Sequence, residues 1–75
     1  MFEVEHEDDA WELGVLFARG FVSGSTEHLG VPESLEKFFF AGCHDHHALG
    51  DERVENIAMS WGLPAPDREL RLENN

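Results

Sequence analysis

The stretch FFFAGCHDHHALG, residues 38–50, carries most of the side chains in this sequence that could do chemistry. Within it, Cys43, His46 and His47 stand at positions i, i+3 and i+4, so all three can approach one side of a helix. Thiolate and imidazole are the ligands that zinc prefers, but structural zinc sites draw two ligand pairs from different elements, and the chain has a single cysteine. We therefore predict no bound metal or other cofactor. A small metal-binding or metal-sensing protein that uses these three residues is kept as an alternative.

The same residues could also suggest catalysis, because a cysteine beside a histidine can form a thiolate–imidazolium pair. Neighbours on one helix rarely meet in the geometry of a nucleophile and its base, and no glycine-rich oxyanion or phosphate loop accompanies Cys43. Three small helices are also expected to leave little volume for a pocket of the usual ~300–1,000 Å³. Asp45, between the histidines, is read as a solvated charge. We predict that the protein is not an enzyme.

Charge is the strongest signal in the composition. Sixteen Asp and Glu residues face five Lys and Arg residues, which gives a formal net charge of −11. Such a surface repels phosphate backbones and anionic membranes, so the predicted partner is a basic surface on another protein. Six of the carboxylates fall within the first twelve residues and are predicted to contact that partner: Glu3, Glu5, Glu7, Asp8, Asp9 and Glu12.

A second predicted contact site lies on a helix expected over residues 32–48. On a helical wheel Phe38 and Phe39 fall on the apolar face and are assigned to the core. Phe40 points to the polar side instead. It shares that side with Glu36, His44 and His47, and we predict that these four residues contact the partner, with Phe40 as the anchor. The alternative is that the N-terminal segment or the C-terminal tail folds over Phe40.

The elements that position these residues form one mainly α domain over residues 1–75. Helices are expected at about 8–22, 32–48 and 51–62, with a flexible tail from about 65 to 75 and a short two-stranded pairing of the N- and C-terminal segments. The helix over 8–22 is apolar around more than half of its circumference, so it is either the central element of the fold or part of a subunit interface. Together with Phe40, this favours a homodimer. The lone cysteine and the lack of an apolar run of about 20 residues indicate a soluble, cytoplasmic protein.

These features together predict a non-enzymatic acidic inhibitor or regulator that occupies a basic, nucleic-acid-binding surface of a partner protein. Small acidic proteins of phages and mobile elements block host nucleases in this manner, so an anti-restriction or anti-CRISPR role of the nucleic-acid-mimic type is the hypothesis. Besides the metal-binding alternative, a structural or assembly subunit whose acidity serves only solubility would show the same charge.

Overall fold

Three α-helices make up most of the part of the chain that the computed structural model describes, residues 3–63. They are α1 (Glu7–Ala18), α2 (Glu36–Asp45) and α3 (Asp51–Ser60), and single 3₁₀ turns, η1 (Glu33–Leu35) and η2 (His46–Ala48), flank α2. No strand occurs among these residues, so the predicted mainly α, three-helix fold is confirmed. The predicted pairing of the two terminal segments and the tail from residue 65 fall outside the described residues. None of the described helices is long and apolar enough to cross a bilayer.

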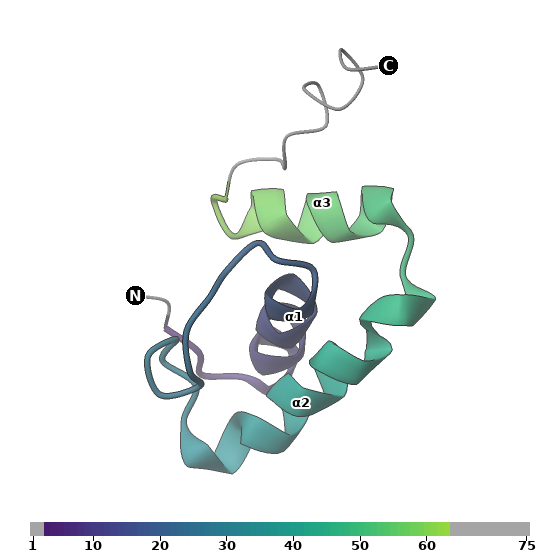
Figure 1. The fold of residues 1–75 in the computed structure, drawn as a ribbon. Helices are drawn as coiled ribbons and strands as arrows, with labels where there is room; N and C mark the ends of the chain where they lie inside the picture. Colours follow the sequence, from purple (N-terminus) through teal and green to yellow (C-terminus); the bar gives the residue numbers. More distant parts are fainter. Residues whose placement is uncertain (1–2, 64–75) are drawn as a thin grey trace.

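Helix α1 is the central element, with α2 on one side and α3 on the other (Figure 1). It contributes five fully buried residues, Ala10, Leu13, Gly14, Val15 and Leu16. Toward α2 the core also contains Val4, Leu29, Val31 and Phe39. Toward α3 it contains Val54 and Ala58. The apolar circumference of α1 is therefore largely covered within one chain. This agrees with the expectation that the helix is the central element of the fold.

Helices α1 and α2 cross in backbone contact, and two glycines allow it. A Cβ atom placed on Gly14 would lie 2.0 Å from the carbonyl oxygen of Phe39, and one on Gly42 would lie 2.0 Å from the carbonyl oxygen of Trp11. A Cα–Cβ bond is about 1.5 Å long, so each oxygen lies no more than about 3.5 Å from the glycine Cα. This is the range of a Cα–H···O contact. The sequence places both glycines on the apolar faces of their helices, and the structure shows that this is where the helices touch.

Two helices end in the same hydrogen-bonded motif, each with a glycine in the left-handed region. After α1, the Phe21 amide donates to the Leu16 carbonyl at 2.9 Å, and Gly20 has φ of 86°. After α3, Gly62 has φ of 77°. This motif needs positive φ at the residue after the cap, which favours glycine. The end of α3 at Gly62 was predicted. The prediction that the first helix continues to Val22 is wrong, because Gly20 ends it four residues earlier.

The predicted helix over 32–48 is also wrong in its extent. The chain forms η1, α2 and η2 in succession, so only ten residues of this segment are α-helical. The first helix was expected to begin at about residue 8; α1 begins at Glu7, and its N-cap is His6. Asp8 and Asp9 lie in the first turn, where their charge still complements the helix dipole.

Candidate functional site

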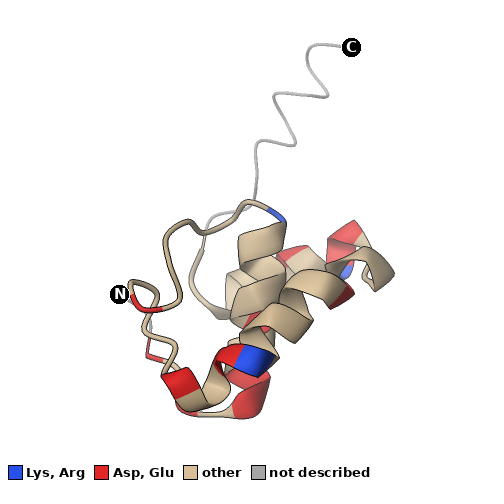
Figure 2. Cartoon of the chain, turned by 60° about the horizontal axis from the view of Figure 1, so that its bottom comes forward, with Lys and Arg blue, Asp and Glu red and all other residues tan. Residues whose placement is uncertain are grey.

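Carboxylates from three separate segments converge at one end of the molecule. Figure 2 shows much of the acidic colour gathered where α1 and α2 begin, and a smaller group on α3. Two surface hollows define this region. They adjoin each other, because Val4 and Glu36 line the larger hollow while their chain neighbours Glu5 and Leu35 line the smaller one. We call the six carboxylates that line them the acidic end: Glu5, Glu7, Asp8, Glu27, Glu33 and Glu36.

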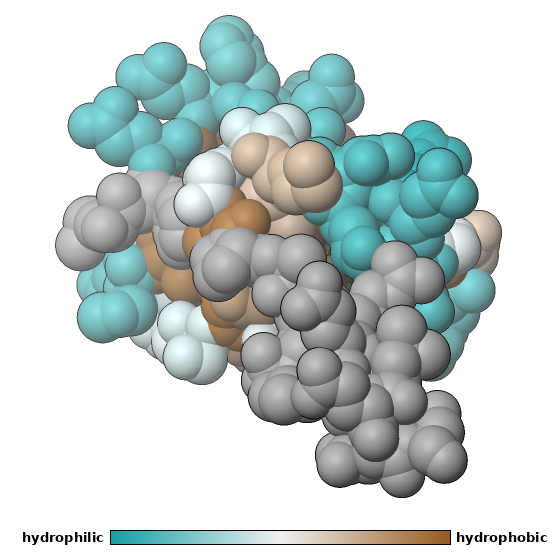
Figure 3. All heavy atoms as spheres, turned by 90° about the horizontal axis from the view of Figure 1, so that it is seen from above, coloured by the Kyte–Doolittle hydropathy of each residue, from teal (hydrophilic) through white to brown (hydrophobic). Residues whose placement is uncertain are grey.

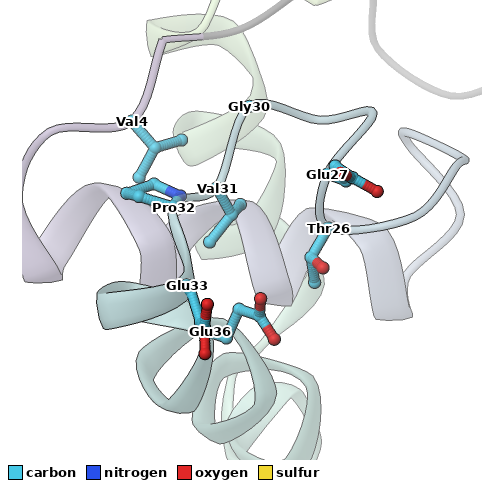
Figure 4. Close-up of a pocket in the computed structure, with 8 residues that line it drawn as sticks. All are labelled: Val4, Thr26, Glu27, Gly30, Val31, Pro32, Glu33 and Glu36. Atoms are coloured by element: carbon cyan, nitrogen blue, oxygen red, sulfur yellow. The ribbon is translucent and has the colours of Figure 1, made fainter.

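The larger hollow has a volume of about 530 Å³ (Figure 4). Val4, Val31 and Pro32 form apolar wall, and the side chains of Glu33 and Glu36 project together from the start of the α2 region. Thr26, Glu27 and Gly30 of the preceding loop complete the lining. The expectation that three small helices leave no hollow of this size is wrong, since the turn 25–31 packs against the N-terminal segment and encloses one. No cysteine or histidine lines it.

The loop before α2 holds the larger hollow in shape. The amide of Val31 donates to the carbonyl of Thr26 at 2.9 Å, and the amide of Leu29 donates to the carbonyl of Ser25 at 2.9 Å. Leu29 and Val31 are 3% and 4% exposed, so both side chains anchor the loop in the core beside Val4. The carboxylate of Glu27 is thus carried by a packed, hydrogen-bonded turn.

Within the described residues, the carboxylates of the acidic end have no ion-pair partner. Within residues 3–63, the ion pairs join Arg19 to Asp51 and His44 to Asp45, and neither involves the acidic end. Lys37 follows Glu36, but its ammonium group lies over the Phe38 ring, 5.2 Å from the ring centroid. As far as residues 3–63 are concerned, the negative charge of the acidic end is therefore not paired with a cationic side chain.

The other three carboxylates predicted to contact a partner have different surroundings. Glu3 is exposed beside the N-terminus, and Asp9 is half-buried in the first turn of α1. Glu12 is half-buried and accepts a hydrogen bond from the indole nitrogen of Trp61, with Nε1 and Oε1 2.7 Å apart. The structure thus joins Glu12 to α3 and gives it a role in holding the helices together.

Phe40 is exposed, as the helical wheel predicts. It is 57% exposed, and its ring packs edge-on against Phe39 with 5.5 Å between ring centroids. Phe17 of α1 packs against the same Phe39 ring, also at 5.5 Å, and is itself 38% exposed. His44 and His47 are exposed on the same segment. The described part of the N-terminal segment leaves Phe40 open, and the tail lies outside the described residues.

Cys43, His46 and His47 do not form a metal centre together. Among residues 3–63 no group of three or more His, Cys, Asp or Glu side chains is close enough to hold one ion. Cys43 is half-buried against the core, and burial raises the pKa of its thiol. A raised pKa disfavours the thiolate that zinc binding or nucleophilic catalysis requires.

His46 and His47 stack on each other with 4.0 Å between ring centroids. The Nδ1 atom of His46 is buried and has no hydrogen-bond partner within the described residues. Burial lowers the pKa of His46, and the charges of His47 and Arg19 lower it further. The neutral ring is therefore the form that the fold favours at this position.

Asp45 is not merely a solvated charge. Its Oδ2 atom accepts a hydrogen bond from Trp11 Nε1 at 2.9 Å, which ties the end of α2 to α1. This bond is the main reason that the pKa of Asp45 is lowered, and His44 contributes as well. Both tryptophans of the chain thus donate their indole N–H groups to carboxylates on neighbouring helices.

Comparison with known proteins adds no assignment, since no protein-family model, no curated protein and no solved structure matches the chain.

Two residues of the acidic end, Glu27 and Glu33, were not predicted as site residues. Glu27 lies in a loop rich in turn-forming residues, and Glu33 follows Pro32 at the start of η1. Their approach to the N-terminal segment depends on the packing of Val31 against Val4, which is a tertiary contact. The only feature of the sequence that could have indicated this site is the presence of acidic residues at the starts of two predicted helices.

Proposed function

We propose that this chain is a non-enzymatic acidic inhibitor or regulator that occupies a basic, nucleic-acid-binding surface of a partner protein. The observation that carries the proposal is the convergence of six carboxylates at one end of the fold, none of which forms an ion pair within residues 3–63. A basic groove that grips phosphates uses arginine and lysine side chains, which bind carboxylates by the same charge-assisted hydrogen bonds. An anti-restriction or anti-CRISPR protein would use such an end to cover the nucleic-acid site of a nuclease.

The alternatives have less support. The metal-binding interpretation loses its main argument because the Cys/His cluster does not converge on one point. An assembly subunit that is acidic only for solubility would be expected to spread its carboxylates evenly. Here three of the six carboxylates of the acidic end belong to the segment 5–8, and the other three come from the loop and from the start of the α2 region.

The test compares charge reversal at two matched glutamates. Glu7 and Glu52 are both exposed and both lie in the first turn of a helix, so Glu7→Lys and Glu52→Lys change the net charge and the helix-dipole energy alike. Proteins captured by the wild-type chain from a lysate of the native host are identified, and binding of each variant is then measured. Glu7→Lys should weaken binding tenfold or more, about 1.4 kcal/mol. Glu52→Lys should weaken it less than threefold, and equal losses would contradict the proposal.

Salt provides a second readout of the same proposal. A complex held by charge should weaken steeply between 50 and 300 mM salt, because screening by salt shortens the range of the attraction. A complex anchored by Phe40 alone should change little over that range. Salt-independent binding would therefore favour an apolar interface over the acidic end.

We further propose that two copies of the chain associate through the surface around Phe17 and Phe40. Both phenylalanines pack against Phe39 and remain exposed, whereas most of the apolar face of α1 is covered. Figure 3 looks onto the α3 side, where hydrophobic residues are visible near the middle of the face and hydrophilic residues lie around part of them. Light scattering should report about twice the chain mass of 8.5 kDa at micromolar concentration. A monomer at about 100 µM, far above ordinary dimer dissociation constants, would contradict the dimer.

A further inference from the structure

We propose that the larger hollow of the acidic end receives an arginine side chain of the partner protein. This inference rests on the proposed function, because it takes the partner to be a protein with a basic surface. It adds the class of side chain that is bound and the residues that bind it, chiefly Glu33, Glu36 and Pro32.

The walls of the hollow match the two halves of an arginine side chain. Pro32 is exposed and offers apolar surface on which a three-carbon stem can lie, as arginine stems do on apolar surfaces; Val4 and Val31 line the hollow too but are 5% and 4% exposed. Glu33 and Glu36 lie at the opposite end of the same hollow and would meet the guanidinium group (Figure 4). The volume of about 530 Å³ leaves room for one side chain and its remaining water.

The charges around the hollow favour a cation. Its lining includes three carboxylates and no lysine, arginine or histidine, and no ion pair within residues 3–63 involves these carboxylates. The loop turn carries Glu27, and the segment that begins with η1 carries Glu33 and Glu36, so the acceptors come from two directions. A ligand that entered the hollow would displace water from these carboxylates. If that ligand had no hydrogen-bond donors, the carboxylates would lose hydrogen bonds without replacement, which costs free energy.

The same arrangement offers no three-ligand site for a small metal ion. Although three glutamates line the hollow, no group of three or more possible ligands converges on one point among the described residues. Carboxylate oxygens placed around a wide hollow can each accept a hydrogen bond from a cation whose N–H donors are spread over a plane. Arginine presents five N–H donors in a rigid fork, whereas the lysine ammonium group is a compact point charge. The geometry therefore points to arginine.

The test is an NMR titration of the ¹⁵N-labelled full chain that needs no knowledge of the partner. The probes are acetyl-Gly-Arg-Gly-amide, its lysine analogue and its citrulline analogue, which has nearly the same shape without the charge. The arginine peptide should cause saturable shifts at the amides of Thr26, Gly30 and Val31. The lysine peptide should bind at least threefold more weakly, and the citrulline peptide and magnesium ions should leave these amides unchanged.

Variants separate this hollow from the general negative charge. Glu33→Lys and the milder Glu36→Gln should weaken arginine-peptide binding tenfold or more and threefold or more, respectively, with the remaining amide spectrum unchanged. Glu52→Lys is the control with the same charge change as Glu33→Lys and should weaken binding less than twofold. Equal losses in Glu33→Lys and Glu52→Lys, equal binding of the lysine and arginine peptides, or no saturable shift at all would each overturn the inference.

Failure of this inference can be told apart from failure of the proposed function. The function is tested with Glu7, which lines the smaller hollow, and with an intact partner. Loss of partner binding in Glu7→Lys without any arginine-peptide binding would refute the arginine site alone. Arginine-peptide binding at the hollow, with partner binding insensitive to Glu7→Lys, would refute the proposed function alone.

Discussion

Replacing Gly14 with alanine should destabilise the fold because the new methyl group has no space. Its Cβ would lie 2.0 Å from the Phe39 carbonyl oxygen, whereas ordinary contact begins at 3.4 Å. That oxygen belongs to the backbone of α2, so no side chain can move aside, and the two helices must separate by about 1 Å. The separation opens the core where Leu13 packs beside Phe39 and breaks the Cα–H···O contacts at the crossing.

The magnitude follows from opposing effects. Forced separation of a packed core costs about 1–3 kcal/mol or more, and each lost Cα–H···O contact costs about 0.5–1 kcal/mol. The higher helix propensity of alanine returns about 1 kcal/mol. We therefore expect Gly14→Ala to lower the free energy of unfolding by about 2–4 kcal/mol, and Gly42→Ala to do the same. For a domain of this size that lowers Tm by well over 5 °C.

The double variant sharpens this prediction. One separation of the helices relieves both clashes, so Gly14→Ala and Gly42→Ala together should cost clearly less than the sum of their separate effects. Gly50→Ala is the control, because its Cβ would meet no atom within 4 Å and its φ of −75° suits alanine. It should change stability by less than about 1 kcal/mol. Urea unfolding followed by circular dichroism measures the four variants and the wild type, and a Gly14→Ala variant as stable as wild type would refute the close crossing.

Three further predictions concern the contacts around the core. Glu12→Ala should lower the free energy of unfolding by about 1–2 kcal/mol, because it removes the carboxylate that accepts the Trp61 indole hydrogen bond; unchanged urea unfolding would contradict this. The pKa of His46 is lowered in the folded state, so the unfolded state binds more protons and Tm should fall as pH drops from about 7.5 through the ordinary histidine value of about 6.5. His46→Gln should make that decline shallower, and an unchanged slope would show that His46 is not responsible. Phe40→Lys should convert the proposed dimer to a monomer in light scattering while circular dichroism stays the same, and a persisting dimer would place the interface elsewhere.

Much of the fold could be predicted because each helix carries its own apolar pattern. The third helix follows i, i+3, i+4 spacing from Val54 onward, and Gly62 marks its end, so prediction and structure differ there by two residues or fewer. The first helix could not be ended correctly from periodicity. Phe21 and Val22 continue the apolar pattern because they still pack against the core, although Gly20 has already turned the chain.

The candidate site was less accessible from the sequence. Local pattern identified the acidic N-terminal segment and the exposure of Phe40, since both follow from residue type and helical position. It did not identify Glu27 or Glu33, whose place depends on Val31 packing against Val4. Contacts such as those of Asp45 with Trp11 and Glu12 with Trp61 are equally invisible, because they join residues 34 and 49 positions apart.

The central claim is that the acidic end and a nucleic acid occupy the same surface of the partner. It is tested most directly by titrating duplex DNA into the complex of this chain with its captured partner, at constant salt, and measuring the affinity between the two proteins. We predict that the apparent dissociation constant rises in proportion to the DNA concentration, and that the Glu7→Lys variant is displaced at lower DNA concentration than Glu52→Lys. A ternary complex of both proteins with DNA, at unchanged affinity, would contradict the claim.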